Sequence, residues 1–213
     1  MAGFGGAIKN LGMGGACIEG KKEQHSVRPF LADPELCTGC GTCVNVCPVG
    51  AITLVNEKST IDSSMCIGCG ECIAHCPEEA LSLNWETEIP EFTERMVEYT
   101  YGLWKKHQGK IGFINFVINV TPECDCFGVS EPTIVRDIGI LASIDPVALD
   151  KACYDLVNKQ TGFSDSRLKN HHSPGEDKFT GLHESTRGDI QLSYGEELGI
   201  GNQDYNLIDL SEK

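Results

Sequence analysis

Eight cysteines fall into two runs whose spacing suits the binding of an inorganic cofactor. In each run three cysteines close one tight loop and a fourth follows just ahead of a proline, which gives the pattern C-x₂-C-x₂-C-x₃-C-P. Thiolates bind [4Fe–4S] clusters with this spacing, and in two-cluster proteins the fourth cysteine of each run binds the other cluster. The sequence therefore predicts two [4Fe–4S] clusters, one held by Cys37, Cys40, Cys43 and Cys76, and the other by Cys66, Cys69, Cys72 and Cys47.

The two runs start 29 residues apart, at Cys37 and Cys66, which indicates a duplicated unit. Glycines between the cysteines permit positive-φ turns that aim backbone N–H groups at sulfur. Two zinc sites are an alternative, but these usually show separated C-x₂-C pairs rather than three cysteines on one loop. Disulfides are disfavoured, because the glycine-rich start of the chain does not read as a secretory leader.

The chain of 213 residues is acidic, with 17 Lys and Arg against 31 Asp and Glu, a net charge of −14 and a pI near 4.8. This balance disfavours nucleic acid and anionic membranes, because both bind clustered basic residues. It favours a redox partner with a basic docking patch. No apolar run is long enough for membrane insertion. The 12 cysteines require a reducing compartment, so a cytoplasmic location is expected.

The cysteine runs lie in residues 27–85, which are predicted to form a small α+β module. This module is too small to bury a core of its own, so the clusters are expected to determine its folding as well as its chemistry. Short strands are expected, the middle two paired as a hairpin, at residues 28–31, 51–55, 59–62 and 80–83.

Residues 86–213 are predicted to form an α/β domain. A helix is expected from Ile89 to His107, where apolar residues recur at helical spacing. The apolar stretch over 111–120 predicts a central strand of a sheet that is covered on both faces. The remaining expectations are a buried strand at 138–143, helices at 145–160 and 189–198, an irregular stretch at 164–188 and a terminal strand at 205–210.

Residues 1–26 are assigned to the same α/β domain, so the cysteine module interrupts it. Two interpretations of this glycine-rich segment remain open. It either faces a ligand, with Lys9 and Asn10 as polar contacts, or packs as irregular backbone. Its spacing is neither the dinucleotide nor the P-loop fingerprint, so no nucleotide site is predicted.

Four cysteines remain outside the two runs, and two of them, Cys124 and Cys126, follow the predicted central strand. Open α/β sheets bind ligands at the carboxyl ends of their strands. Cys124, Asp125 and Cys126 are therefore candidates for a metal site, a redox-active pair or an acid–base site, with Lys9 as a further candidate catalytic residue. The alternative is that these cysteines pack as small apolar residues, as is expected of Cys153.

Residues 27–85 resemble bacterial-type two-cluster ferredoxins over their full length, and the resemblance implies the same ligand sets. The rest of the chain resembles the iron–sulfur branch of an uncharacterised family, domain of unknown function 362. Members of that family carry an α/β region ahead of the glycine-rich stretch, which implies a fragment, a missing half supplied by another polypeptide, or a homo-oligomer. The stretches that carry the resemblance are residues 5–14, 112–116, 121–128, 137–142 and 145–150.

The expected fold is thus an α+β ferredoxin-type two-cluster module inserted in a partial α/β domain. The expected function is electron transfer through two [4Fe–4S] clusters to or from a redox partner. The first alternative is a redox enzyme whose clusters feed a second metal or thiol site at Cys124, Asp125 and Cys126. The second is a regulatory sensor whose clusters report oxygen or iron.

Overall fold

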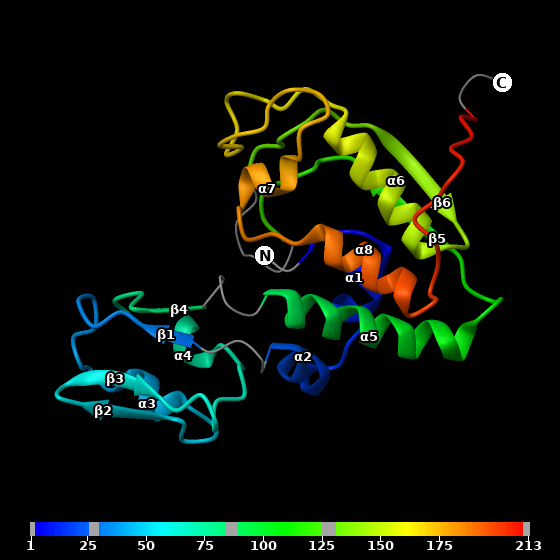
Figure 1. Cartoon of the computed structure of the whole chain (residues 1–213). Coiled ribbons are helices and arrows are strands. Elements are labelled where there is room, and N and C mark those ends of the chain that lie inside the picture. The colour runs from blue at the N-terminus through cyan, green and yellow to red at the C-terminus, as the bar shows by residue number, and fades with distance from the viewer. Residues whose placement is uncertain (1–2, 26–29, 84–88, 125–130, 211–213) are drawn as a thin grey trace. The chain divides into compact units, whose positions relative to one another are not determined.

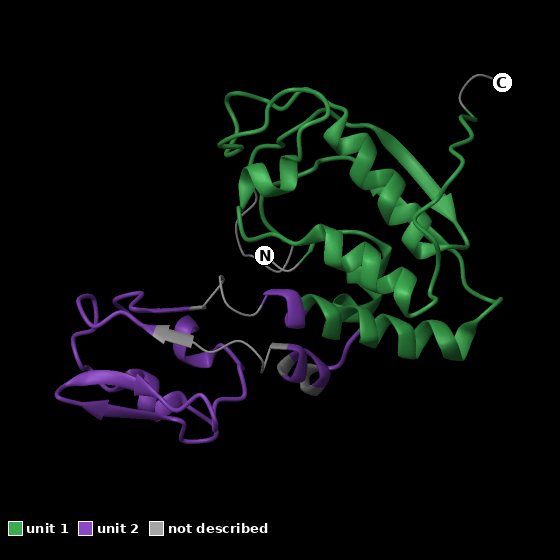
Figure 2. Cartoon of the chain, viewed as in Figure 1, with its two compact units in different colours: residues 1–15, 93–213 green, residues 16–92 purple. Residues whose placement is uncertain are grey.

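The computed structural model of the chain describes residues 3–25, 30–83, 89–124 and 131–210. The elements are shown in Figure 1, and the division into two compact units is shown in Figure 2. Unit 1 consists of Met1–Gly15 together with Thr93–Lys213, and unit 2 is the continuous stretch Ala16–Phe92. The cysteine module expected at 27–85 lies within unit 2, and of the glycine-rich segment residues 1–15 belong to unit 1 and residues 16–26 to unit 2.

Unit 2 contains two short antiparallel sheets. The hairpin of β2 (Ile52–Val55) and β3 (Lys58–Ile61) turns at Asn56 and Glu57, whose φ angles are 50° and 61°. Two left-handed residues match the twist of the flanking strands in such a turn. The second sheet pairs β1 (Phe30–Ala32) with β4 (Leu81–Leu83). Strands are thus confirmed at the four expected places, although residues 28 and 29 lie outside the described part of the chain.

The helices of unit 2 are short, and its core is small. α2 (Ile18–His25) comes first in the chain, and α3 (Thr42–Val46) and α4 (Glu71–Ala74) each follow a left-handed glycine. Two of the four buried residues in the apolar cluster of unit 2 are predicted ligands. The interior of this unit is therefore built in part from the residues that would hold a cofactor. The four buried residues are Cys43, Ile52, Cys72 and Leu81.

The longer helices of unit 1 follow the sequence pattern closely. α5 (Ile89–His107), whose first residues belong to unit 2, α6 (Pro146–Asn158) and α8 (Gly188–Glu197) cover the expected ranges. Asp145 caps α6, because its carboxylate accepts a hydrogen bond from the Ala148 N–H at 2.9 Å. Proline fits at the first position of α6, because an N–H group at that position would have no acceptor within the helix and proline has none to satisfy.

The strands of unit 1 are arranged differently from the expectation. β5 (Phe113–Val117) and β6 (Gly139–Ser143) pair antiparallel, and no further strand joins them within the described ranges (Figure 1). On the outer face Ile114, Phe116 and Ile140 are 61%, 63% and 64% exposed. The expectation of a central strand covered on both faces is therefore wrong, because a continuous apolar run does not by itself reveal how many faces are buried. The described chain is a mixed α+β fold with three two-stranded sheets.

The glycine-rich start of the chain is helical rather than irregular. α1 (Ala7–Lys9) continues directly into the π-helical turn η1 (Asn10–Gly14). The buried carboxylate of Asp150, on α6, accepts hydrogen bonds from the Ala7 N–H at 2.7 Å and the Ile8 N–H at 3.0 Å. The first turn is thus capped by a residue far along the chain, which no local pattern indicates.

Two further segments of unit 1 differ from the expectation. α7 (Lys178–Leu182) lies in the stretch expected to be irregular, and Asp177 caps it by accepting from the Phe179 N–H at 2.9 Å. The terminal strand expected at 205–210 is not formed; instead the Tyr205 hydroxyl donates to the Asp155 carboxylate at 3.0 Å. Among the described helices, none combines the length and the apolar character that crossing a bilayer requires.

Candidate metal centres

The two halves of unit 2 repeat the same hydrogen bonds at positions 29 residues apart. In the first half the Asp33 N–H donates to the Ala80 carbonyl at 2.8 Å. In the second half the Asp62 N–H donates to the Ala51 carbonyl, also at 2.8 Å. Each bond runs from one half to the other, so the duplicated sequence folds as two interlocked and equivalent halves.

The fourth cysteine of each run is held in the same way in both halves. The Ala51 N–H donates to Cys47 Sγ at 3.2 Å, and the Ala80 N–H donates to Cys76 Sγ at 3.4 Å. Hydrogen bonds to ligand sulfurs are one of the means by which proteins tune iron–sulfur centres. The backbone therefore provides these sulfurs with donors of the kind that such centres use.

Left-handed glycines shape both cysteine loops. Gly39 and Gly41 have φ angles of 72° and 76°, and their counterparts Gly68 and Gly70 have φ angles of 64° and 81°. At Gly39 a Cβ would also collide with the main-chain carbonyl oxygen of Glu57. Conformation and space therefore both require glycine in the first loop.

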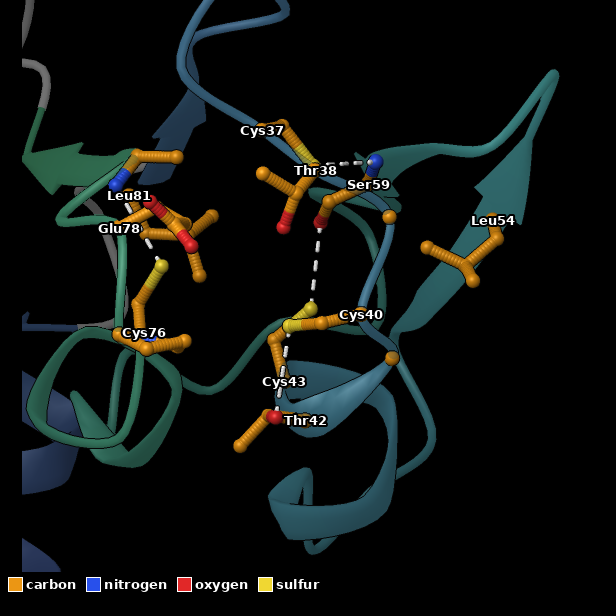
Figure 3. Close-up of a pocket in the computed structure, with 14 residues that line it drawn as sticks. Cys37, Thr38, Cys40, Thr42, Cys43, Leu54, Ser59, Cys76, Glu78 and Leu81 are labelled. Atoms are coloured by element: carbon orange, nitrogen blue, oxygen red, sulfur yellow. Dashed lines mark hydrogen bonds between the residues drawn. The ribbon is translucent and has the colours of Figure 1, made fainter.

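A pocket in unit 2 brings together the four cysteines predicted for the first cluster. It is lined by Cys37, Cys40 and Cys43 of the first run and by Cys76 of the second. In Figure 3, Cys76 faces the other three cysteines across the pocket. Four thiols drawn from two runs are the donor set of a [4Fe–4S] cluster whose fourth ligand is exchanged between runs.

The other four cysteines interact with one another electrostatically. Burial raises the pKa of the Cys66 thiol, and Cys69 and Cys47 add to the shift. Burial also raises the pKa of the Cys72 thiol to about 11, with further contributions from Cys66 and Cys69. Such interactions act only over short distances. Cys47 of the first run and the buried Cys72 of the second run also belong to the same apolar cluster of unit 2.

The first group fits a [4Fe–4S] cluster by number, chemistry and pairing across the runs, and the second group corresponds to it through the repeat. Within the described ranges, no three His, Cys, Asp or Glu side chains are grouped so as to hold a single metal ion. In a [4Fe–4S] cluster each thiolate binds a separate iron, so the four ligands surround a volume instead of meeting at one point. Coordination also deprotonates the thiols, which overcomes the raised pKa of Cys72.

The other candidate residues belong to a different part of the chain. Lys9 and Cys124 are in unit 1, whereas Asp125 and Cys126 lie outside the described residues. Lys9 is buried at the end of α1, and Cys124 is half-buried. A paired Cys124/Cys126 site therefore stays a prediction.

A group of charged side chains beside Cys124 was not expected from the sequence. His183 Nε2 lies 3.4 Å from Glu123 Oε1 without a hydrogen bond between them, and both side chains are mostly buried. Arg167 Nη1 contacts the Glu131 carboxylate at 2.7 Å and Glu123 Oε1 at 3.7 Å. An imidazole beside a carboxylate is a pair that can exchange protons. The members are scattered along the sequence, so no spacing motif marks them.

His183 is expected to make unit 1 less stable as the pH falls from about 6.5 towards 5. Burial lowers the pKa of His183 below its ordinary value, although Glu123 acts in the opposite direction. The folded state then binds a proton less readily than the unfolded state, so stability that is present above the unfolded pKa is lost on acidification.

The His183→Gln variant should lose less urea stability across this pH window than the parent chain. Unfolding is followed by Trp104 fluorescence in a Trp85→Phe background, because these are the two tryptophans of the chain. Equal losses in the variant and the parent would show that His183 is not responsible.

The fold is that of a mixed α+β protein in which four cysteines line one pocket of unit 2. The family model described as "Domain of unknown function (DUF362)" matches residues 1–155, and the chain belongs to this family. No curated protein matches the chain. The expected family is thus confirmed, while its iron–sulfur branch remains a prediction. The matched residues include all of unit 2 and unit 1 up to and including Asp155.

Proposed function

We propose that the protein transfers electrons through two [4Fe–4S] clusters to or from a redox partner. The observation that carries this proposal is the gathering of Cys37, Cys40, Cys43 and Cys76 around one pocket. For the other cluster the support is the repeat, because the second run has the same spacing and the hydrogen bonds of Asp33 and Asp62 match. Exchange of the fourth cysteine is the ligand arrangement of two-cluster ferredoxins.

When bound, the clusters would supply one-electron redox chemistry. The chain itself holds the sulfurs in place and limits how they move. The Ala51 and Ala80 N–H groups fix Cys47 and Cys76, the two ligands that are exchanged between halves. The left-handed glycines let the backbone close around each site, and the crossed hydrogen bonds keep the two sites in one rigid segment.

The proposal includes a partner with a basic docking patch, because the chain carries a net charge of −14. It also includes the cytoplasm as the location, since the ligand thiols must stay reduced until iron binds. Neither nucleic acid nor insertion into a membrane is part of the proposal.

Electron transfer from the reduced protein to a basic acceptor is expected to slow as salt is added. Cytochrome c, a basic haem protein, serves as the probe in anaerobic stopped-flow measurements. Between about 0.01 M and 0.15 M salt we expect the second-order rate constant to fall about tenfold, because salt screens the attraction that steers the encounter. A neutral quinone acceptor is the control and should show little change. A salt-independent rate with cytochrome c would argue against docking through the acidic surface.

A redox enzyme is the second candidate function. In such an enzyme the two clusters would deliver electrons to a site at Cys124, Asp125 and Cys126. The contact between His183 and Glu123, the residue before Cys124, favours this candidate because the pair can exchange protons with a substrate.

Metal content distinguishes the two functions. After anaerobic reconstitution the electron carrier should hold about eight irons per chain, and the Cys124→Ser, Cys126→Ser variant should hold the same amount. Zinc, nickel or extra iron that is lost in this variant would favour the enzyme. Cys17→Ser is the matched control, since Cys17 is an exposed cysteine outside both groups. A parent chain that binds no iron would reject both functions.

A further inference from the structure

Hydroxyl groups lie against the sulfurs of the first site. Thr42 Oγ1 is hydrogen-bonded to Cys40 Sγ at 3.4 Å, and Ser59 Oγ is hydrogen-bonded to Cys43 Sγ at 3.5 Å. The Ser59 N–H also donates to Cys37 Sγ at 3.4 Å. Figure 3 shows these bonds in the pocket. Once iron has deprotonated the cysteines their sulfurs only accept hydrogen bonds, so both hydroxyls then act as donors.

The second site lacks these hydroxyls. The 29-residue repeat relates Thr42, at the start of α3, to Glu71 at the start of α4. It relates Ser59 on β3 to Phe30 on β1. Neither Glu71 nor Phe30 has a hydroxyl. The matching backbone hydrogen bonds, such as those of Asp33 and Asp62, do not distinguish the two sites, whereas these hydroxyl side chains do.

The solvation and the charge of the two sites can also be compared. Cys40 is exposed, whereas its counterpart Cys69 is only half-exposed, so the first site is the better solvated. Glu78 lines the first pocket, and Glu71 directly follows the cysteine loop of the second run at the start of α4. Both glutamates are exposed, so solvent screens their charges and the two effects largely offset each other. The hydroxyls and the solvation therefore distinguish the sites, as does Lys58, whose Nζ donates to the Cys37 carbonyl oxygen and whose positive charge also favours the reduced first cluster.

We infer that the two clusters differ in reduction potential and that the cluster of Cys37, Cys40, Cys43 and Cys76 is the easier to reduce. This inference rests on the proposed function. Reduction adds negative charge to the cluster, which strengthens the hydrogen bonds that its sulfurs accept, so donors stabilise the reduced form. Better solvation acts in the same direction. An electron on the second cluster is then transferred to the first. In the singly reduced protein the electron is therefore on the first cluster.

Redox titration followed by EPR and visible absorbance should give two midpoint potentials in the parent chain. In the Thr42→Val, Ser59→Ala variant the higher midpoint should fall and the lower one should stay. Loss of two hydrogen bonds corresponds to a roughly tenfold smaller equilibrium constant for reduction, or about 59 mV for a one-electron couple. Thr60→Val is the matched control, because Thr60 is the next residue on β3 and is exposed. It should leave both midpoints unchanged.

A reciprocal variant tests the other site. Glu71→Thr places a hydroxyl at the counterpart of Thr42 and should raise the lower midpoint. Glu71→Gln removes the charge without adding a hydroxyl and should raise it less. If the Thr42→Val, Ser59→Ala protein fails to assemble its clusters, the two Glu71 variants are sufficient to test the inference.

The inference is overturned by a single midpoint in a parent chain with two full clusters, by a fall in the lower midpoint of the Thr42→Val, Ser59→Ala variant, or by no shift in either series. Iron and sulfide contents are measured first, so that failure of the proposed function can be distinguished from failure of this inference. A parent chain without clusters contradicts the proposed function itself. Two clusters of equal potential contradict only this inference.

Discussion

Removing iron from the reconstituted protein is expected to unfold unit 2 while unit 1 stays folded. The apolar cluster of unit 2 has four buried residues, and two of them, Cys43 and Cys72, are predicted ligands. So small a core does not outweigh the entropy of ordering the chain, so metal binding supplies much of the folding free energy. Unit 1 has two larger apolar clusters and does not depend on metal in this account.

Hydrogen exchange followed by mass spectrometry tests this expectation. After anaerobic chelation, amides of β2 and β3 should exchange at least about a thousandfold faster, which corresponds to a loss of roughly 4 kcal/mol of local stability. Amides of α6, in unit 1, are the internal control and should keep their protection. Unchanged protection in β2 and β3 after complete loss of iron would show that unit 2 folds without clusters.

Replacing Asp150 with alanine is expected to destabilise unit 1 by roughly 3–5 kcal/mol. The Asp150 side chain is fully buried. Besides the N–H groups of Ala7 and Ile8, it accepts from Asn115 Nδ2 at 2.8 Å and from Gln191 Nε2 at 3.2 Å. Removing the carboxylate leaves four donors in the interior without their acceptor, and each pays a desolvation penalty.

Urea unfolding monitored by Trp104 fluorescence measures this effect. Asp165→Ala, at an exposed aspartate of the same unit, should change stability by less than about 0.5 kcal/mol. Asp150→Asn keeps the size and one acceptor oxygen, so it should fall between the parent and Asp150→Ala. If Asp150→Ala were as mild as Asp165→Ala, the carboxylate would not be what holds the start of the chain in place.

Features with local causes were predictable from the sequence. The cysteine spacing and its repeat indicated two equivalent halves, and the structure has matching hydrogen bonds at Asp33 and Asp62. The strands of unit 2 and the helices α5, α6 and α8 also followed from patterns within about twenty residues. Asp145 followed by proline marked the start of α6, because cap and first-turn preferences are local.

Features that depend on distant contacts were not predictable. The helix at the start of the chain is capped by Asp150, which lies more than a hundred residues away. The apolar stretch containing β5 indicated a strand but not that its outer face would be exposed. The contact between His183 and Glu123 joins α7's end to the loop after β5, and neither residue stands in a recognisable motif.

EPR of the anaerobically reconstituted, dithionite-reduced protein tests the central claim most directly. Two reduced [4Fe–4S] clusters held in one small unit should give an interacting signal that integrates to about two spins per chain. The Cys76→Ser variant should disturb the cluster bound by the first run, although Cys76 belongs to the second run, because Cys76 lines the pocket of Cys37, Cys40 and Cys43. A parent protein that binds zinc without iron, or that integrates to one spin or none, would contradict the account.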